Sequence, residues 1–326
     1  FTLLLSKLIT TSMTQSFQEL DMILGDQNER YFSSGFSKFN YYIHHFLFSA
    51  EKELTGSFRV KYNGPARPRG EQPHLGSMEY TAMAIFLAEG MLSAYLRLTE
   101  RELAMAVPYY LLLNIHAPSK LEGQTDIQFS CRVVNTENSL KAINIGLTTL
   151  EIRISDCDIR FVVDHPGPTQ ITAKKGFVWP SGSRWLYKDI YKERSLNINQ
   201  LDVNPTAETI AAKIEHPKNY QKNPLGISSS KNILTPLDYL SVTGQLMQVL
   251  LYDILQTSRT ICPNIWLRSM EINFSRPYQL SAYTARIHFK SRRAISLKGK
   301  QWQLIDLSSD MANMQGSFRI CHQMPE

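Results

Sequence analysis

The chain contains a weak internal repeat, which restricts its possible folds more than any other feature of the sequence. With Glu79 set against Asp238, an offset of 159 residues, the segment 74–92 falls on 233–251, and the aligned cores read L-G-S-M-E-Y and L-T-P-L-D-Y. A second offset of 155 places Phe36-Ser-Lys on Tyr191-Lys-Glu. Self-similarity at one long period indicates a duplicated, domain-sized unit. Without a gap, the offset of 159 also pairs identical residues further along: Leu87 with Leu246, Asn114 with Asn273, Pro118 with Pro277, Leu121 with Leu280, Arg160 with Arg319 and Pro166 with Pro325.

Each copy has one long helix that the sequence pattern predicts to be largely buried. In the first copy, apolar residues recur at three-to-four spacing over 78–96, which is the period of a helix packed on a core. In the second, Thr235 suits the N-cap, Pro236 suits the first helical position, and Asp238 follows the cap by three residues, as in a capping box. These signals predict a second helix over 236–255.

β-rich segments with alternating polarity follow each helix, and this order predicts the fold. A helix wrapped by an antiparallel sheet satisfies it, so we expect an α+β tandem, or double, hotdog: two long central helices, each wrapped by its own sheet. The predicted domains are an N-terminal extension (1–30), a first hotdog-like repeat (31–168), a Pro- and Gly-containing connector (169–185) and a second repeat (186–326). The predicted strands are 55–62, 109–115, 126–134, 143–154 and 158–164 in the first repeat, and 209–215, 265–274, 282–289, 300–307 and 316–322 in the second.

Composition excludes several other classes of protein. The chain has 326 residues, 43% of them hydrophobic and 20% charged, which is ordinary for a globular protein. It lacks the run of about 18 apolar residues that a membrane span requires, so we expect no membrane span. Its four cysteines form no C-x-x-C pair, which fits a reducing cytoplasm. The net charge of +6 is mild, and we expect no nucleic-acid partner. The basic residues are concentrated only at 290–300. We interpret this segment as a solvated hairpin loop rather than as a docking patch for an acidic partner.

Six short motifs resemble those of the avirulence protein D (AvrD) family, and together they span nearly the whole chain. The motif L-G-D…R-Y-F-S-S-G-F at 24–36 resembles the opening of AvrD-family sequences. The first half carries P-H-L-G-S-M-E-Y at 73–80, F-L-A-E at 86–89 and L-E-I-R…I-R-F-V-V-D-H-P-G at 150–167. The second half carries L-T-P-L-D-Y…Q-L-M-Q-V-L-L-Y at 234–252 and I-W-L-R at 265–268. Their order along the chain makes the resemblance more specific than any one motif does.

The resemblance implies an enzyme of small-molecule biosynthesis. The AvrD family is associated with syringolides, acyl-sugar lactones built from a β-ketoacyl chain and a pentulose. A more remote similarity is to the A-factor (butenolide) synthases, which join a β-ketoacyl thioester to a three-carbon phosphate. The implied substrates are an acyl-CoA or acyl-carrier-protein thioester and a sugar-type acceptor, with acyl carrier protein as a candidate partner and no permanently bound cofactor.

Glu79 and Asp238 occupy equivalent positions near the starts of the two predicted helices. A helix N-terminus offers free N–H groups that could polarise a thioester carbonyl, and a carboxylate there could move a proton. The alternative is that both carboxylates simply cap their helices. For Asp238, behind the N-cap residue Thr235, the two interpretations balance; for Glu79, whose candidate cap is Gly76, catalysis is slightly favoured.

His74 has no counterpart in the second copy, where Ile233 stands, and histidine titrates near neutral pH, as a general base should. It is our first candidate for catalysis, although a histidine after proline is often only a surface or capping residue. Arg67 and Arg69 could hold a phosphate or carboxylate, or could only keep a loop soluble. Other candidate substrate-binding residues are Ser77, Thr235, Gln245 and Arg268, with either Gln245 or Gln248 expected to face the cleft. No metal site is expected, because His44 and His45 have no third ligand at a suitable spacing.

Three functional hypotheses remain open at this stage. The sequence has no G-x-G-x-x-G, Walker A, G-x-S-x-G or H-E-x-x-H pattern. The first hypothesis is a condensing enzyme in which His74, aided by Glu79 or Asp238, activates the acceptor of an acyl group. The second is a dehydratase or thioesterase of the same architecture. The third is a non-catalytic ligand-binding or scaffold protein, docked through 290–300.

Overall fold

The computed structural model of the protein describes most of the chain. The described residues are 18–49, 52–64, 72–140, 145–167, 184–194, 196–215, 224–229, 233–259, 261, 265–275, 282–297 and 299–324. Arg67 and Arg69 lie outside them, as do residues 1–17 and nearly all of the expected connector.

Two 19-residue helices, α3 (Ser77–Tyr95) and α5 (Pro236–Ile254), form the centres of the two halves. Their first and last residues are both separated by 159 positions, the offset of the sequence repeat. Seventeen residues of α3 and fifteen of α5 are buried, and helices buried on nearly every side are surrounded by protein rather than lying on a surface. The helix predicted over 236–255 is therefore present and ends one residue early.

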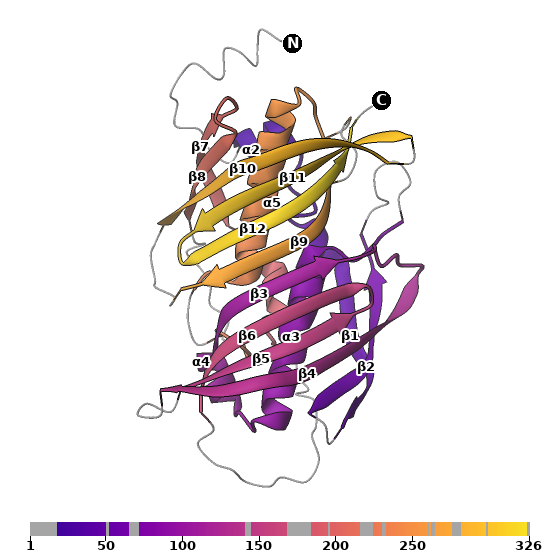
Figure 1. Ribbon diagram of the computed structural model, residues 1–326, viewed down its shortest axis with the longest axis vertical. Coiled ribbons are helices and arrows are strands. Elements are labelled where there is room, and N and C mark those ends of the chain that lie inside the picture. Colours follow the sequence, from indigo (N-terminus) through magenta and orange to yellow (C-terminus); the bar gives the residue numbers. More distant parts are fainter. Residues whose placement is uncertain are drawn as a thin grey trace.

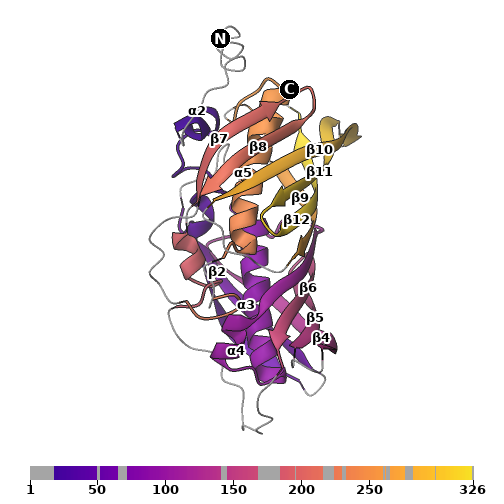
Figure 2. The same ribbon diagram turned by 90° about the vertical axis from the view of Figure 1, so that its left-hand side faces the viewer.

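The strands form one continuous antiparallel sheet in the order β1-β2-β4-β5-β6-β3-β9-β12-β11-β10-β8-β7. Six strands belong to each half, and the halves lie one beyond the other along the long axis, joined where β3 meets β9 (Figure 1). In the view turned by 90°, α3 and α5 lie within the curvature of the sheet, which is the arrangement of a hotdog fold (Figure 2). The strands are β1 (Phe39–Phe48), β2 (Glu53–Tyr62), β3 (Val107–Ile115), β4 (Gln124–Leu140), β5 (Ile145–Ile154), β6 (Cys157–Pro166), β7 (Asn197–Asn204), β8 (Thr209–Glu215), β9 (Ile265–Phe274), β10 (Ala282–Leu297), β11 (Lys300–Met311) and β12 (Met314–Gln323).

The pairing of β3 with β9 has the register of a two-fold axis. Leu112 faces Glu271, and these two residues are themselves 159 apart. On either side, Leu111 faces Ile272 and Leu113 faces Met270. Replacing each residue of one pair by its counterpart 159 positions away gives the other pair, so the axis passes through Leu112 and Glu271.

The segment before the first strand of each half packs on the helix of the other half. Ser241 of α5 donates a hydrogen bond to the Phe32 carbonyl (2.6 Å), while Trp185 packs edge-on against Phe86 of α3. Between them, η1 (Gly35–Lys38) and η4 (Ile190–Glu193) stand 155 positions apart, and Phe36 stacks on Tyr191 at 5.8 Å between ring centroids. The halves thus share a core as well as a sheet.

The structure corrects the interpretation of 290–300 as a hairpin loop. Residues as far as Leu297 continue β10, and Lys300 already begins β11. Two of the positive charges meet carboxylates, because Arg292 pairs with Glu208 and Arg293 approaches Asp306 within 3.7 Å. Glu208 lies in the turn before β8 and Asp306 lies in β11, so the sequence around 290 could not show these partners.

Two further short helices are described, α2 (Gln18–Leu24) and α4 (Glu100–Met105). Among the described residues, no helix is both long enough and apolar enough to cross a membrane.

Candidate active site

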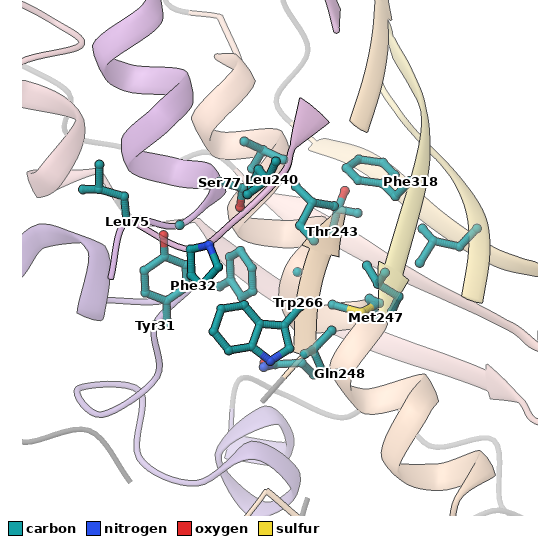
Figure 3. Close-up of a pocket in the computed structure, with 18 of the residues that line it drawn as sticks. Tyr31, Phe32, Leu75, Ser77, Leu240, Thr243, Met247, Gln248, Trp266 and Phe318 are labelled. Carbon is teal, nitrogen blue, oxygen red and sulfur yellow. The ribbon is translucent and has the colours of Figure 1, made fainter. Parts of the chain in front are cut away.

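A cavity of about 150 Å³ lies where the N-terminus of α3 meets the middle of α5. A dry cavity of this size accommodates a ligand such as benzene. Tyr31 and Phe32 lie on one side of it, and Met247 and Phe318 on the other (Figure 3). Both halves contribute to the walls: residues His74, Leu75, Gly76 and Ser77 precede or begin α3, Leu240, Thr243, Gly244, Met247 and Gln248 come from α5, and Ile265, Trp266 and Leu267 begin β9.

The first turn of α3 begins at this cavity and has backbone hydrogen-bond donors for which no acceptor is found among the described residues. Gly76 is the N-cap and has no side chain to accept a bond from the helix. Among the described residues, no acceptor is found for the backbone N–H groups of Ser77 and Met78. Free N–H groups and the positive end of the helix dipole attract an oxygen that carries negative charge. Ser77, one of the predicted substrate-binding residues, lines the cavity at this turn.

The Glu79 carboxylate caps the start of α3 and also accepts a hydrogen bond from Tyr31. Its Oε2 accepts a bond from the Gly76 N–H (2.9 Å) and another from the Tyr31 hydroxyl. A Cβ atom on Gly76 would lie 2.3 Å from that hydroxyl oxygen, so a glycine is required for the phenol to reach the carboxylate. Glu79 is fully buried and does not line the cavity, whereas Tyr31 does. Glu79 therefore reaches the site through Tyr31.

His74 lies at the mouth of the same cavity. Its ring stacks on the Trp266 indole, with centroids 4.7 Å apart and an angle of 23° between the planes, and its Nδ1 lies 3.3 Å from the Gln72 carbonyl. The stacking fixes the plane of the imidazole, and the carbonyl suits an Nδ1–H donor, which leaves Nε2 as the basic nitrogen. The structure thus brings His74 and Ser77 together at one cavity.

The opposite wall, on α5, is mainly apolar with two polar groups. Thr243 and Gln248 line the cavity, and Thr243 Oγ1 lies 3.5 Å from Ser309 Oγ. The Phe32 ring packs directly on Gly244, where a Cβ atom would lie 2.5 Å from the ring. The glycine therefore lets the first half close over the second helix.

Asp238 has a different environment from Glu79. Its Oδ2 accepts a hydrogen bond from the N–H of the N-cap residue Thr235 (2.8 Å). The carboxylate also forms a two-pronged ion pair with Arg194: Nε donates to Oδ1 (3.0 Å) and Nη2 donates to Oδ2 (2.6 Å). Both partners are buried, and neither Thr235 nor Asp238 lines the cavity. These contacts favour the capping interpretation of both residues over the catalytic and substrate-binding ones.

Two predicted binding residues point elsewhere. Gln245 is buried and donates to the Ser241 carbonyl of its own helix (3.2 Å), so Gln248 is the glutamine that faces the cavity. Arg268 is exposed on β9 and does not line the cavity. Tyr31, Trp266 and Thr243 were missed as site residues, since each joins the site only through contacts between distant parts of the chain.

A family model described as Pseudomonas avirulence D protein (AvrD) matches residues 15–325. The chain belongs to the AvrD family. Four of the six motif segments that carry the AvrD resemblance meet at the cavity: 24–36 through Tyr31, 73–80 through His74 and Ser77, 234–252 through Gln248, and 265–268 through Trp266. Four AvrD motif segments thus meet at a cavity whose walls come from both halves.

Several solved structures are similar to this AvrD-family chain. The tesB protein of Mycobacterium avium subsp. paratuberculosis has 10% identity and a TM-score of 0.42, over 86% of this chain and 96% of that one. An acyl-ACP thioesterase of Bacteroides thetaiotaomicron has 8% identity and a TM-score of 0.42, over 82% and 98%. The 12:0-ACP thioesterase of Umbellularia californica has 7% identity and a TM-score of 0.45, over 84% and 95%. No curated protein sequence matches the chain.

Proposed function

We propose that this protein is a biosynthetic enzyme that condenses a β-ketoacyl thioester with a sugar-like acceptor to give a syringolide-like acyl-sugar lactone. The architecture that we infer is a tandem double hotdog in which one of two equivalent clefts keeps the chemistry. The observation that carries the proposal is the start of α3, where the N-cap Gly76 has no side chain to accept from the helix N–H groups, beside His74 at a largely apolar cavity. Membership of the AvrD family and the similarity to acyl-ACP thioesterases support acyl thioesters as the substrate class.

The proposed first step is transfer of the acyl group from sulfur to oxygen. His74 takes the proton from an acceptor hydroxyl, and that oxygen attacks the thioester carbonyl carbon. The resulting oxyanion accepts hydrogen bonds from the N–H groups of the first turn of α3. The C–S bond then breaks, the thiolate takes the proton from His74, and the products are an ester and a free thiol. Tyr31, whose proton is directed to Glu79, can accept a hydrogen bond from a neighbouring hydroxyl of the same acceptor and so orient the attacking hydroxyl toward His74.

The test is release of thiol from a β-ketoacyl-CoA by the purified protein, with and without polyhydroxy acceptors, combined with mass analysis of the ester. We expect thiol release to require an acceptor. We expect His74→Ala to lower kcat by about a hundredfold or more, the usual contribution of a general base. The matched control is His116→Ala, because His116 is exposed, pairs with Asp158 and does not line the cavity.

Two results would contradict the proposal. An unchanged rate in His74→Ala would remove the histidine from the mechanism. Thiol release at full rate without any acceptor would instead indicate a thioesterase. Repeating the assay with the acyl group on acyl carrier protein decides which carrier is preferred.

A further inference from the structure

The two-fold relation of the halves defines a second place on the molecule that is equivalent to the cavity. On α5 the cavity is lined by Leu240, Thr243, Gly244, Met247 and Gln248. Their counterparts on α3, 159 positions earlier, are Thr81, Ala84, Ile85, Ala88 and Glu89. Tyr31 and Phe32 correspond, at the offset of 155, to Leu186 and Tyr187, and Ile265 corresponds to Ala106.

The segment 224–229 covers this second place. Leu225 forms a β-bridge with Trp185, and its carbonyl accepts a hydrogen bond from the Leu186 N–H (2.9 Å). Ser228 donates its N–H to the Ala106 carbonyl (2.8 Å). Between these two anchors lie Gly226 and Ile227. The segment therefore spans the two positions that correspond to Tyr31 and Ile265, which both line the first cavity.

Glu89 lies directly beneath the covering segment. Its Oε1 accepts a hydrogen bond from the Ile227 N–H (2.8 Å), and a Cβ atom on Gly226 would lie 2.2 Å from the same oxygen. Gly226 has φ = +101° and Ser228 has φ = +63°, backbone conformations that most residues avoid. The segment thus fits over the carboxyl group only because position 226 has no side chain.

Several polar atoms at this second place are buried without a hydrogen-bond partner. Among the described residues, none is found for Glu89 Oε2, Thr81 Oγ1 or Trp185 Nε1, and these three side chains are each exposed by 1% or less. Thr81 and Glu89 lie on one face of α3, two helical turns apart, with Ala84, Ile85 and Ala88 on that face between them. Buried polar atoms without partners are costly in a protein interior, and a ligand that satisfied them would recover that free energy.

We propose that the Glu89 region is a second ligand site, closed in this structure by the segment 224–229, and that it binds a small uncharged molecule carrying a secondary amide. The amide is indicated by what Glu89 holds now, which is the backbone N–H of Ile227. A ligand amide takes that place when the segment moves out, and its remaining polar groups reach Thr81 and Trp185. We expect an uncharged ligand because burial raises the pKa of the Glu89 carboxyl group and so favours its neutral, protonated form. This site is separate from the catalytic cavity and does not depend on the proposed reaction.

The test opens the site and measures binding of defined probes to the full-length protein by calorimetry. The probes are pantetheine, which carries two secondary amides, and N-acetyl-isoleucine N-methylamide, which imitates Ile227; glycerol is the probe without an amide. In Gly226→Ala the new methyl group displaces the segment from Glu89, so the closed state no longer competes with the ligand. We expect the affinity for at least one amide probe to rise by about tenfold. Gly299→Ala is the matched control, since Gly299 also has positive φ (+73°) but no atom within 4 Å of the added carbon.

Substitutions at Glu89 and at its counterpart Gln248 then distinguish the second site from the first cavity as the place where the probe binds. Adding Glu89→Leu to Gly226→Ala should abolish the gain, whereas adding Gln248→Leu, its counterpart in the first cavity, should leave it intact. Binding of pantetheine alone would identify the carrier arm of thioesters as the ligand, and binding of both probes would identify the amide itself. No gain in Gly226→Ala, an equal gain for glycerol, or loss of the gain through Gln248→Leu would overturn the proposal.

A measurement on the unaltered protein keeps the proposal testable if Gly226→Ala fails to fold. Hydrogen exchange of the backbone amides of 225–228 should become faster when an amide probe is added, because the ligand stabilises the open segment. Exchange in this segment that stays unchanged or slows at high probe concentration would overturn the proposal.

Discussion

The starts of α3 and α5 show how two equivalent residues acquire different tasks. Glu79 and Asp238 both cap their helices, but their outer partners differ: Glu79 holds the Tyr31 hydroxyl, while Asp238 holds the Arg194 guanidinium. Tyr31 itself lines the cavity, whereas Asp238 is held in a buried two-pronged ion pair and does not line it. One helix start is therefore open to ligands, and the other is fixed for stability.

This difference predicts that Asp238→Ala destabilises the protein without altering the chemistry of each folded molecule. The substitution removes the cap of α5 and leaves the Arg194 guanidinium buried without its carboxylate partner. Breaking a buried pair in this way costs about 3–5 kcal/mol, which should appear as a lower midpoint in urea unfolding. Asp306→Ala, which breaks a more exposed pair with Arg319, is the control and should cost about 1 kcal/mol or less. Loss of kcat in correctly folded Asp238→Ala would return Asp238 to the list of catalytic residues.

The sequence could identify the site residues that belong to a local signal and missed the rest. His74 and Ser77 are found because they directly precede or begin a helix that the apolar period reveals. Tyr31 and Trp266 come from segments distant in the sequence, and only the packing of 31–32 on α5 and the pairing of β9 with β3 bring them to the same cavity. No local pattern records those long-range contacts.

At the scale of elements, prediction succeeded where capping and periodicity were both clear. The start of α5 at Pro236 and the limits of β8 and β9 agree with the sequence-based expectation. The short helix α4 was missed, although Thr99 and Glu102 form a T-x-x-E capping box: the Glu102 N–H donates to Thr99 Oγ1 (3.3 Å), and the Thr99 N–H donates to Glu102 (2.7 Å). The signal was present, but six residues are too few to show a helical period.

Helix α3 carries a buried acid that should make stability depend on pH. Burial raises the pKa of Glu89 well above its ordinary value of 4.5, and the single hydrogen bond from Ile227 only partly opposes this. Above pH 4.5 the unfolded chain releases this proton while the folded protein retains it. The free energy of unfolding therefore falls as the pH rises, by about 1.4 kcal/mol per pH unit, until the pH passes the raised pKa of the folded protein.

Glu89→Gln should remove this dependence. The amide oxygen can still accept the Ile227 hydrogen bond, but the side chain has no proton to lose. We expect the variant to have nearly the stability of the unaltered protein at pH 5 and to exceed it increasingly towards pH 8, as measured by urea unfolding at each pH. The control is Glu100→Gln, at an exposed position in the first turn of α4. A constant difference in stability between pH 5 and pH 8 would show that the folded protein does not hold the Glu89 proton.

For the whole molecule, the repeat offset indicated the equivalence of the halves, but the way they join could not be read from it. A single chain can place two such units side by side with separate sheets. Here β3 and β9 pair about an axis through Leu112 and Glu271, and Phe36 stacks on Tyr191. The connection depends on which sheet edges are left unpaired after each half has formed, and that is a property of the folded halves.

Because the halves share a sheet and a core, we expect them to unfold in one cooperative transition. Leu87 and Leu246 occupy equivalent positions on α3 and α5, and both are completely buried. Replacing either with alanine should cost about 2–5 kcal/mol, through lost apolar contacts and the cavity that remains. Each replacement should shift the same single transition, observed both by the far-ultraviolet circular dichroism of the helices and by tryptophan fluorescence. If Leu87→Ala moved one transition and Leu246→Ala moved another, the halves would be independent folding units, and the β3–β9 junction would contribute little to stability.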